Sequence, residues 1–150
     1  MIIGVLKEPD FETRVSLLPE HIASLIKWKT GVIIETGAGD SAYARDEKYA
    51  EAGATIHPRA YILQNADLIL SINALTEADI NSCKAKVIFG FYQPLYNPSV
   101  IKEWANKGFS IFSIDMLPRT TRAQSMDVLS SQANIAGYKA VLLAANLFPK

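Results

Sequence analysis

The densest group of chemically useful side chains lies in residues 117–140, which read LPRTTRAQSMDVLSSQANIAGYKA. Its first part concentrates hydrogen-bond donors and acceptors: Arg119, Arg122, Gln124, Asp127 and Ser130. An arginine donates to carboxylate or phosphate oxygens, and a glutamine amide both donates and accepts, so these residues could hold a polar ligand. A structural role is also open, because Thr121 with Gln124 fits a capping box and Asp127 suits the first turn of a helix. One cap, however, leaves two arginines and a glutamine unexplained.

A second candidate is the glycine-rich turn at residues 37–42, GAGDSA, which follows a β-branched run. It fits the G-x-G-x-x-A form of a dinucleotide-binding turn. The helix that such a turn should open is poorly formed, since residues 43–52 are rich in charge and Gly53 ends them early. No acidic residue clearly ends a strand at the distance required for a ribose contact. We therefore interpret residues 37–42 as a plain strand-to-helix turn.

The other reactive residue types are isolated. His21 and His57 are far apart, and neither has a second ligand type at metal-binding spacing. Cys83 is the single cysteine, and no serine lies in a G-x-S-x-G elbow, so nucleophilic catalysis has no support. Lys7 and Arg14 follow the first predicted strand, at the edge of an open α/β sheet where ligands bind. Surface charges explain this pair equally well, and both interpretations stay open.

Short β-branched runs alternate with segments of helical periodicity, which is typical of a parallel sheet covered by helices. Pro19 opens a helix that Gly31 ends, and Asn97 with Pro98 opens another that ends at Gly108. The predicted strands are residues 2–6, 32–36, 67–72, 86–92 and 109–114, with a weaker one at 54–57. The pattern predicts an α/β fold with an open, mostly parallel sheet, Rossmann-like or flavodoxin-like, and helices on both faces.

From Ser125 onward the pattern predicts one long helix, directly after which the sequence stops. Small side chains recur on one face of this helix and would let another backbone approach closely; they are Ala133, Gly137, Ala140 and Ala144. We expect residues 1–124 to form an N-terminal α/β domain in which the loop 115–130 carries the candidate ligand residues. Residues 125–150 would then be a connector helix leading to a further domain that follows Lys150.

The composition indicates one compact domain and no strongly charged partner. The chain has 150 residues, 49% of them hydrophobic, and its 15 basic residues balance its 15 acidic ones. This balance gives no reason to expect nucleic acid or an anionic membrane surface as a partner. The first residues lack the features of a signal peptide, and the longest apolar stretch falls far short of the ~20 residues of a membrane helix. With a single cysteine, the chain fits a reducing compartment, so we predict the cytoplasm.

The stretch 122–140, RAQSMDVLSSQANIAGYKA, closely resembles the most characteristic segment of the alpha subunits of proton-translocating nicotinamide nucleotide transhydrogenases. The resemblance extends through GVLKEPDFETRVSLLP at the start, ETGAGDSA and DLILSINA, and so covers essentially the whole chain. In this family the nucleotide fingerprint lies in a second domain, so the resemblance implies a separate NAD-binding domain beyond Lys150. It also implies that the GAG turn belongs to the shared framework of the first domain.

Carried over by position, the resemblance implies that Arg119, Gln124, Asp127 and Ser130 lie around the nicotinamide end of NAD(H), with Arg119, Gln124 and Asp127 as the catalytic residues. The loop 115–130 would then face the nicotinamide. Amide and hydroxyl groups suit this task, because they can hold the carboxamide and the ribose. Asp127 would hold Arg119 in place or meet the carboxamide amine. Many relatives have a lysine where this sequence has Ser71.

Alanine dehydrogenase is a related family with the same N-terminal KE-x(n)-RV pattern, and its chemistry differs. Reductive amination moves protons as well as a hydride, so it needs a general acid and base, supplied in that family by a histidine after the fifth strand. The matching position in VIFGFYQPLYNP is Gln93, and the lysine that holds the substrate carboxylate is matched by Asn73. Hydride passage between two nicotinamide rings needs alignment and exclusion of water but no proton donor.

The resemblance therefore implies a subunit that binds NAD(H) and exchanges hydride with NADP(H) held by a beta subunit or domain, coupled to a membrane-embedded proton channel. It also implies a homodimer, cytoplasmic and peripheral to the inner membrane through its partner subunits. The fragment alone is expected to be inactive. Two alternatives stay open: the N-terminal domain of an alanine dehydrogenase, and a non-catalytic ligand-binding or assembly module.

Overall fold

The computed structural model of the chain describes residues 1–118 and 120–148. The chain divides into two compact units, Met1–Ser113 and Ile114–Lys150. The predicted loop 115–130 and the predicted connector helix both lie in the second unit. The expected division after residue 124 concerns the domains of the intact protein and stays a prediction. Among the described residues, no helix is both long and apolar enough to cross a membrane.

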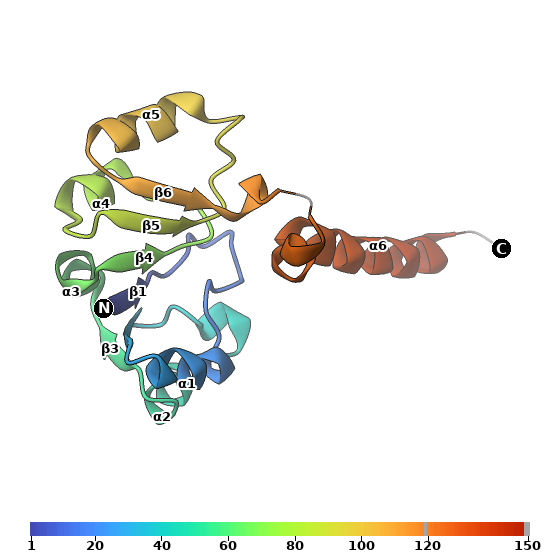
Figure 1. Cartoon of the computed structure of the whole chain (residues 1–150). Helices are drawn as coiled ribbons and strands as arrows, with labels where there is room; N and C mark the ends of the chain where they lie inside the picture. The colour runs from blue at the N-terminus through green and yellow to red at the C-terminus, as the bar shows by residue number, and fades with distance from the viewer. Residues whose placement is uncertain (119, 149–150) are drawn as a thin grey trace. The chain divides into compact units, whose positions relative to one another are not determined.

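The first unit is built on one sheet of six parallel strands in the order β3-β2-β1-β4-β5-β6 (Figure 1). The strands are β1 (Ile2–Val5), β2 (Gly31–Glu35), β3 (Thr55–His57), β4 (Leu68–Leu70), β5 (Val87–Gly90) and β6 (Ser110–Ser113). All six predicted strands are present within a few residues of their predicted bounds. The order reverses between β1 and β4, so the carboxyl ends of these two strands mark the switch point at which doubly wound sheets bind ligands. The predicted α/β class is confirmed.

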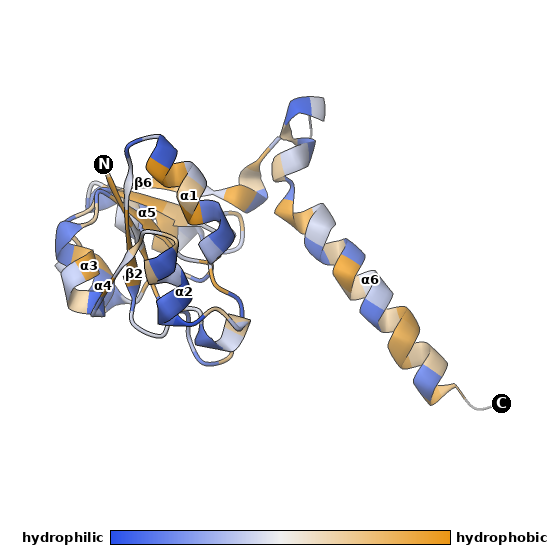
Figure 2. Ribbon diagram, turned by 90° about the horizontal axis from the view of Figure 1, so that it is seen from below, coloured by the Kyte–Doolittle hydropathy of each residue, from blue (hydrophilic) through white to orange (hydrophobic). Residues whose placement is uncertain are grey.

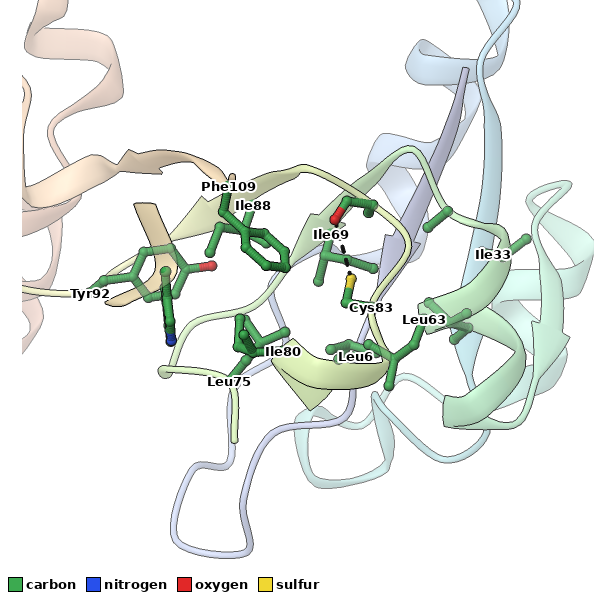
Figure 3. Close-up of a cluster of buried hydrophobic side chains, with 14 residues drawn as sticks. Leu6, Ile33, Leu63, Ile69, Leu75, Ile80, Cys83, Ile88, Tyr92 and Phe109 are labelled. Atoms are coloured by element: carbon green, nitrogen blue, oxygen red, sulfur yellow. Dashed lines mark hydrogen bonds between the residues drawn. The ribbon is translucent and has the colours of Figure 1, made fainter. Parts of the chain in front are cut away.

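Helices cover both faces of this sheet. They are α1 (Pro19–Lys27), α2 (Asp46–Glu51), α3 (Arg59–Asn65), α4 (Glu77–Ser82) and α5 (Pro98–Asn106). One core joins the strand residues Ile69 and Ile88 to Leu63 of α3, Ile80 of α4 and Trp104 of α5. Figure 3 shows Ile69 and Ile88 in one cluster with Leu63 of α3 and Ile80 of α4. A second core on the opposite face packs α1 and α2 against β1 and β2.

The second face is covered over only part of its width. Along one register row, Ile34, Val5, Leu70, Phe89 and Phe112 lie side by side on β2, β1, β4, β5 and β6. The first two are 0% exposed, Phe89 is 38% exposed and Phe112 is 55% exposed. The rings of the two phenylalanines stack on one another, with centroids 6.4 Å apart. Within Met1–Ser113, the apolar surface of β5 and β6 on this face therefore remains in contact with solvent.

Two details of the predicted helix ends are wrong. Gly31 does not end α1, because the helix already ends at Lys27; Lys29, with a φ of 58°, reverses the chain, and Gly31 opens β2. Asn97 precedes α5, but its side chain does not cap the helix, because Nδ2 donates to the carbonyl oxygen of Tyr92 at 3.2 Å. Gly108, with a φ of 83°, follows the end of α5 as predicted.

The second unit consists of two 3-10 turns and one long helix: η2 (Ile114–Met116), η3 (Thr121–Met126) and α6 (Val128–Leu147). The prediction that the long helix begins at Ser125 is wrong. Ser125 lies in η3, and Asp127, with φ −78° and ψ 89°, breaks the two helices apart and caps the second. Lys139 is the one charged residue in the 20 residues of α6. Hydrophobic residues recur along the length of this helix, interspersed with polar ones (Figure 2). No residue of α6 is buried within the described chain.

Candidate functional site

Three of the four predicted site residues lie together. A cavity of about 470 Å³ in the second unit is lined by Gln124, Asp127 and Ser130. The same wall contains Asp115 of η2 and Thr120, the residue that precedes η3. Arg119, the fourth predicted site residue, lies outside the described residues. The cavity volume falls in the ordinary range of small-molecule pockets.

Asp127 has a structural role that its geometry makes plain. Its Oδ1 accepts a hydrogen bond from the backbone N–H of Ser130 at 3.1 Å, and its Oδ2 accepts one from the Ser130 hydroxyl at 2.6 Å. The carboxylate therefore caps α6 and complements the positive end of the helix dipole. This confirms the structural interpretation of Asp127. The same two bonds fix the Ser130 side chain at the wall of the cavity.

Gln124 has no such structural role. The predicted capping box of Thr121 with Gln124 is wrong, because the residue before η3 is Thr120 and no side chain caps that turn. The backbone oxygen of Gln124 accepts a hydrogen bond from the N–H of Asp127. Gln124 itself is exposed. Among the described residues, no side chain or backbone group forms a hydrogen bond with its side-chain amide. A carboxamide that both donates and accepts is thus available to a ligand in the cavity.

The described part of the cavity wall has a simple electrostatic character. Its polar groups are hydroxyls, one carboxamide and the carboxylates of Asp115 and Asp127, with apolar contacts from Ile114 and Leu129. None of the described lining residues is a histidine, lysine or cysteine. Such a wall can orient a polar ligand and favour a cationic ring, but it offers no side chain that ordinarily exchanges protons near neutral pH.

A second hollow, of about 450 Å³, lies in the first unit at the switch point between β1 and β4. We call it the switch crevice; its lining includes Lys7, Glu8, Glu35, Arg59, Ser71, Asn73, Thr76 and Asp79. Lys7 therefore lies where ligand clefts occur in such sheets. Arg14 does not line the crevice. It forms a hydrogen-bonded ion pair with Glu12 at 2.6 Å, which agrees with the interpretation of Arg14 as a surface charge.

An ion network that the sequence analysis missed closes one side of this crevice. Arg59, at the start of α3, donates two bonds of 2.8 Å to the carboxylate of Asp79 and one of 2.8 Å to Glu35. The hydrogen bond with Asp79 raises the pKa of Arg59 further above its usual value. Burial tends to raise the pKa of Asp79, but hydrogen bonds from Arg59 and Thr76 outweigh it, and the pKa is lowered. The Thr76-x-x-Asp79 capping box was the one local signal of this network.

The GAG turn packs against its own chain. Gly37, with a φ of 71°, donates its N–H to both carboxylate oxygens of Asp46 at 3.0 and 3.1 Å. The turn opens only a three-residue 3-10 helix, η1 (Asp40–Ala42). A Cβ added at Gly39 would meet the carbonyl oxygen of Ala44 and the ring of Tyr49. These contacts support its interpretation as a structural turn, because the amide that a phosphate would need is already bonded.

The structure also shows the surroundings of the positions at which the sequence analysis contrasted transhydrogenase with alanine dehydrogenase. Gln93 follows β5 with a left-handed φ of 49° and an exposed side chain. Asn73 follows β4, and its Nδ2 donates to Glu8 at 3.0 Å. Ser71 is buried and shares a 2.9 Å hydrogen bond with the hydroxyl of Tyr92, whose pKa burial raises. That hydrogen bond gives Ser71 a structural role.

The isolated reactive residues have structural surroundings. His57 stacks on Tyr61, with ring centroids 4.0 Å apart, and its Nε2 lies 3.1 Å from the hydroxyl of Thr55. Cys83 is buried, its thiol directed at the carbonyl oxygen of Ala85, and burial raises its pKa. Among the described residues, no three histidine, cysteine, aspartate or glutamate side chains lie close enough to hold a metal ion.

Comparison with known proteins places these features in a family. Residues 4–136 match the model of the family "Alanine dehydrogenase/PNT, N-terminal domain". The NAD(P) transhydrogenase subunit alpha of Haemophilus influenzae is 38% identical over 150 residues, which are 99% of this chain and 29% of that subunit. The alanine dehydrogenase of Bacillus subtilis is 27% identical over 152 residues, or 100% of this chain and 39% of that enzyme.

A solved structure agrees with these sequence similarities. The transhydrogenase from Sinorhizobium meliloti matches with a TM-score of 0.92 and 36% identity, over 100% of this chain and 46% of that one. The chain therefore spans less than half the length of these relatives. The sequence resemblance noted above is confirmed: the chain belongs to the alanine dehydrogenase/PNT N-terminal domain family.

Proposed function

We propose that this chain is the N-terminal part of the NAD(H)-binding alpha subunit of a proton-translocating NAD(P) transhydrogenase. In the intact protein, hydride passes directly between NAD(H) on this subunit and NADP(H) on a partner component. The observation that carries the proposal is the cavity in which Gln124, Asp127 and Ser130 come together, in a chain 38% identical to a transhydrogenase alpha subunit.

The donor set of this cavity suits a nicotinamide. Its carboxamide needs one acceptor and one donor, which the Gln124 side chain supplies, and its ribose needs hydroxyl or carboxylate partners such as Ser130. When bound, NAD(H) supplies the hydride; the chain's own residues bind and orient the ring and keep water from it. The ring carries a positive charge only in its oxidised form, so Asp115 and Asp127 would favour that form. In our proposal Arg119, Gln124 and Asp127 are the catalytic residues, with Ser130 as a further cofactor ligand.

Alanine dehydrogenase chemistry is the second candidate, because the chain is 27% identical to the Bacillus subtilis enzyme. That reaction needs a proton donor and acceptor beside the transferred hydride. The described cavity wall holds no histidine, and the position matched to the family's histidine is Gln93, whose amide has no useful pKa. These residues favour hydride exchange between two nicotinamides. A non-catalytic assembly module is the remaining alternative, and it predicts no turnover of either kind.

The proposal extends to the assembly. The intact subunit would form a homodimer, lie on the cytoplasmic side of the inner membrane, and act with an NADP(H)-binding beta subunit and a membrane-embedded proton channel. Its NAD-binding domain would follow residue 150, so the 150-residue chain alone should bind NADH weakly or not at all. Micromolar NADH binding by the isolated chain in calorimetry would contradict that division of the site.

The test uses the intact subunit, reconstituted with its NADP(H)-binding component. Gln124→Ala should lower the rate of hydride transfer at least tenfold, about 1.4 kcal/mol of transition-state stabilisation, and change NADH affinity much less. Gln64→Ala, which removes a glutamine of α3 from the surface of the other unit, serves as the matched control. Wild-type turnover by Gln124→Ala would refute the role of the loop. Pyruvate-dependent NADH oxidation by the wild type would favour alanine dehydrogenase instead.

A further inference from the structure

The turn between β5 and α5 presents two large apolar side chains to solvent. We call residues 93–97 the anchor turn; within it, Leu95 is 77% exposed and Tyr96 is 85% exposed. The surrounding stretch, residues 87–101, contains no charged residue, although 20% of the chain is charged. Depletion of charge together with exposed aromatic and aliphatic side chains is typical of the centre of a protein–protein interface. The composition of the anchor turn is therefore that of a docking surface.

The backbone of the anchor turn is held in one shape by hydrogen bonds. The carbonyl oxygen of Gln93 accepts from the N–H of Tyr96 at 2.9 Å and from the N–H of Asn97 at 3.0 Å. The Asn97 side chain donates to the carbonyl oxygen of Tyr92 at 3.2 Å. Gln93 has a left-handed φ of 49°, which is costly for any residue but glycine and persists where surrounding bonds fix it. Because the turn is ordered in advance, a partner that binds Leu95 and Tyr96 need not order their backbone.

The anchor turn is also joined to the strand that leads to the candidate site. The backbone N–H of Tyr92, directly before the turn, donates to the Ser113 hydroxyl at 2.8 Å. Ser113 is the last residue of β6, and the chain passes from it directly into η2. Because β5 and β6 are parallel, the anchor turn and the exit of β6 lie at the same edge of the sheet (Figure 1). A protein docked on the anchor turn would therefore lie at the edge from which the loop 115–130 begins.

The identity of the docked protein follows from the reaction proposed above, on which this inference rests. Direct hydride transfer needs the two nicotinamide rings in contact, so the protein that holds NADP(H) must reach the loop 115–130. We propose that the anchor turn is a docking site for this NADP(H)-binding component, with Leu95 and Tyr96 as its apolar contacts. The two side chains bind the partner protein and touch neither nucleotide. They set how tightly the component binds and leave the hydride step to the residues of the cavity.

The test measures hydride transfer by the intact subunit while the concentration of the NADP(H)-binding component is varied. Tyr96→Ser should raise the concentration that gives half-maximal transfer at least about tenfold, and Leu95→Ser should raise it in the same direction. The rate at saturation should change by less than about twofold, because neither side chain touches a nucleotide. Tyr96→Phe keeps the ring and should dock as the wild type does. Trp28→Ser is the matched control, since Trp28 is 76% exposed and lies between α1 and β2, at the opposite edge of the sheet.

Three results would overturn the docking site. The first is an unchanged half-maximal concentration in both Tyr96→Ser and Leu95→Ser. The second is dissociation of the subunit's own oligomer by Tyr96→Ser in analytical ultracentrifugation, which would assign the anchor turn to a contact between copies. The third is a loss of NADH affinity in Tyr96→Ser, which would assign the turn to the subunit's own NAD-binding domain. No hydride transfer by the wild type would refute the proposed function and the docking site with it, whereas wild-type transfer with unchanged variants refutes the docking site alone.

Discussion

Replacing Asp127 by asparagine separates the two roles that its position allows. The carboxylate caps α6 through the N–H of Ser130 and also lines the candidate cavity. Asparagine is as good a helix cap as aspartate, since its side-chain oxygen accepts the same bond, but it carries no charge. Alanine removes both the cap and the charge. The pair Asp127→Asn and Asp127→Ala therefore distinguishes a structural residue from one that acts on the cofactor.

The expected magnitudes follow from the contacts. Asp127→Ala loses the 3.1 Å bond to the Ser130 N–H and the 2.6 Å bond from its hydroxyl, which should lower the free energy of unfolding by about 1.5 kcal/mol. Asp127→Asn keeps the cap and loses the interaction of the charge with the helix dipole, about 0.5 kcal/mol. For hydride transfer we expect both variants to lose at least about 1.5 kcal/mol, roughly tenfold in rate, because a charged hydrogen-bond partner is removed.

Stability would be measured by urea unfolding followed by circular dichroism. Hydride transfer would be measured with the intact subunit and its NADP(H)-binding component. An NAD⁺ analogue whose reduced form absorbs apart from NADPH makes the reaction visible. Wild-type turnover by Asp127→Asn would mean that this carboxylate serves α6 alone, and would refute our assignment. Equal loss of stability in the two variants would instead refute the capping argument.

Three further predictions concern the first unit. Gly4→Ala should destabilise the fold by about 2 kcal/mol in urea unfolding, because the added Cβ would lie 2.5 Å from a buried isoleucine of α3; wild-type stability would contradict this packing. Arg59→Lys keeps the charge but cannot make the two-bond contact with Asp79. Because the Arg59 side chain is only partly exposed, this change should lower the free energy of unfolding by about 2 kcal/mol. A negligible decrease would rule out the network as a source of stability. The hydrogen bond from Arg14 lowers the pKa of Glu12 from 4.5 to about 2. This pair should therefore stabilise the fold above pH 4.5 and lose that contribution as the pH falls toward about 2. The difference in free energy of unfolding between the wild type and Glu12→Gln should shrink over that range.

The strands and the fold class could be predicted because their signal is local. Runs such as residues 32–34 alternate with helical segments, and this pattern is enough to indicate a parallel α/β sheet. The short helices α2, α3 and α4 have only six or seven residues, which is too few to show a clear helical period. Only α4 had a distinct start signal, its capping box. The strand order depended on contacts between distant residues and could not be derived from the pattern.

Some residues of the candidate site could be named from the sequence, whereas other contacts could not. The resemblance led to Gln124, Asp127 and Ser130, and the structure places all three at one cavity. The start of α6 was misplaced because Asp127 was interpreted as a residue within the first turn, whereas it is the cap that precedes it. The contact of Glu8 with the loop after β4 joins residues 64 positions apart in the sequence, and no local pattern announces such a pair.

The uneven cover over the sheet should make local opening uneven as well. Val5 and Ile34 lie in the middle of the sheet under α1 and α2, whereas Phe112 lies on an edge strand with one face in water. In hydrogen exchange we therefore expect the amides of β1 and β2 to report global unfolding, and those of β6 to exchange through smaller, more frequent openings. β6 is the strand from which the chain continues into η2 and the candidate site. A weakly protected strand would thus anchor the loop, which gives the loop freedom to rearrange without unfolding the core.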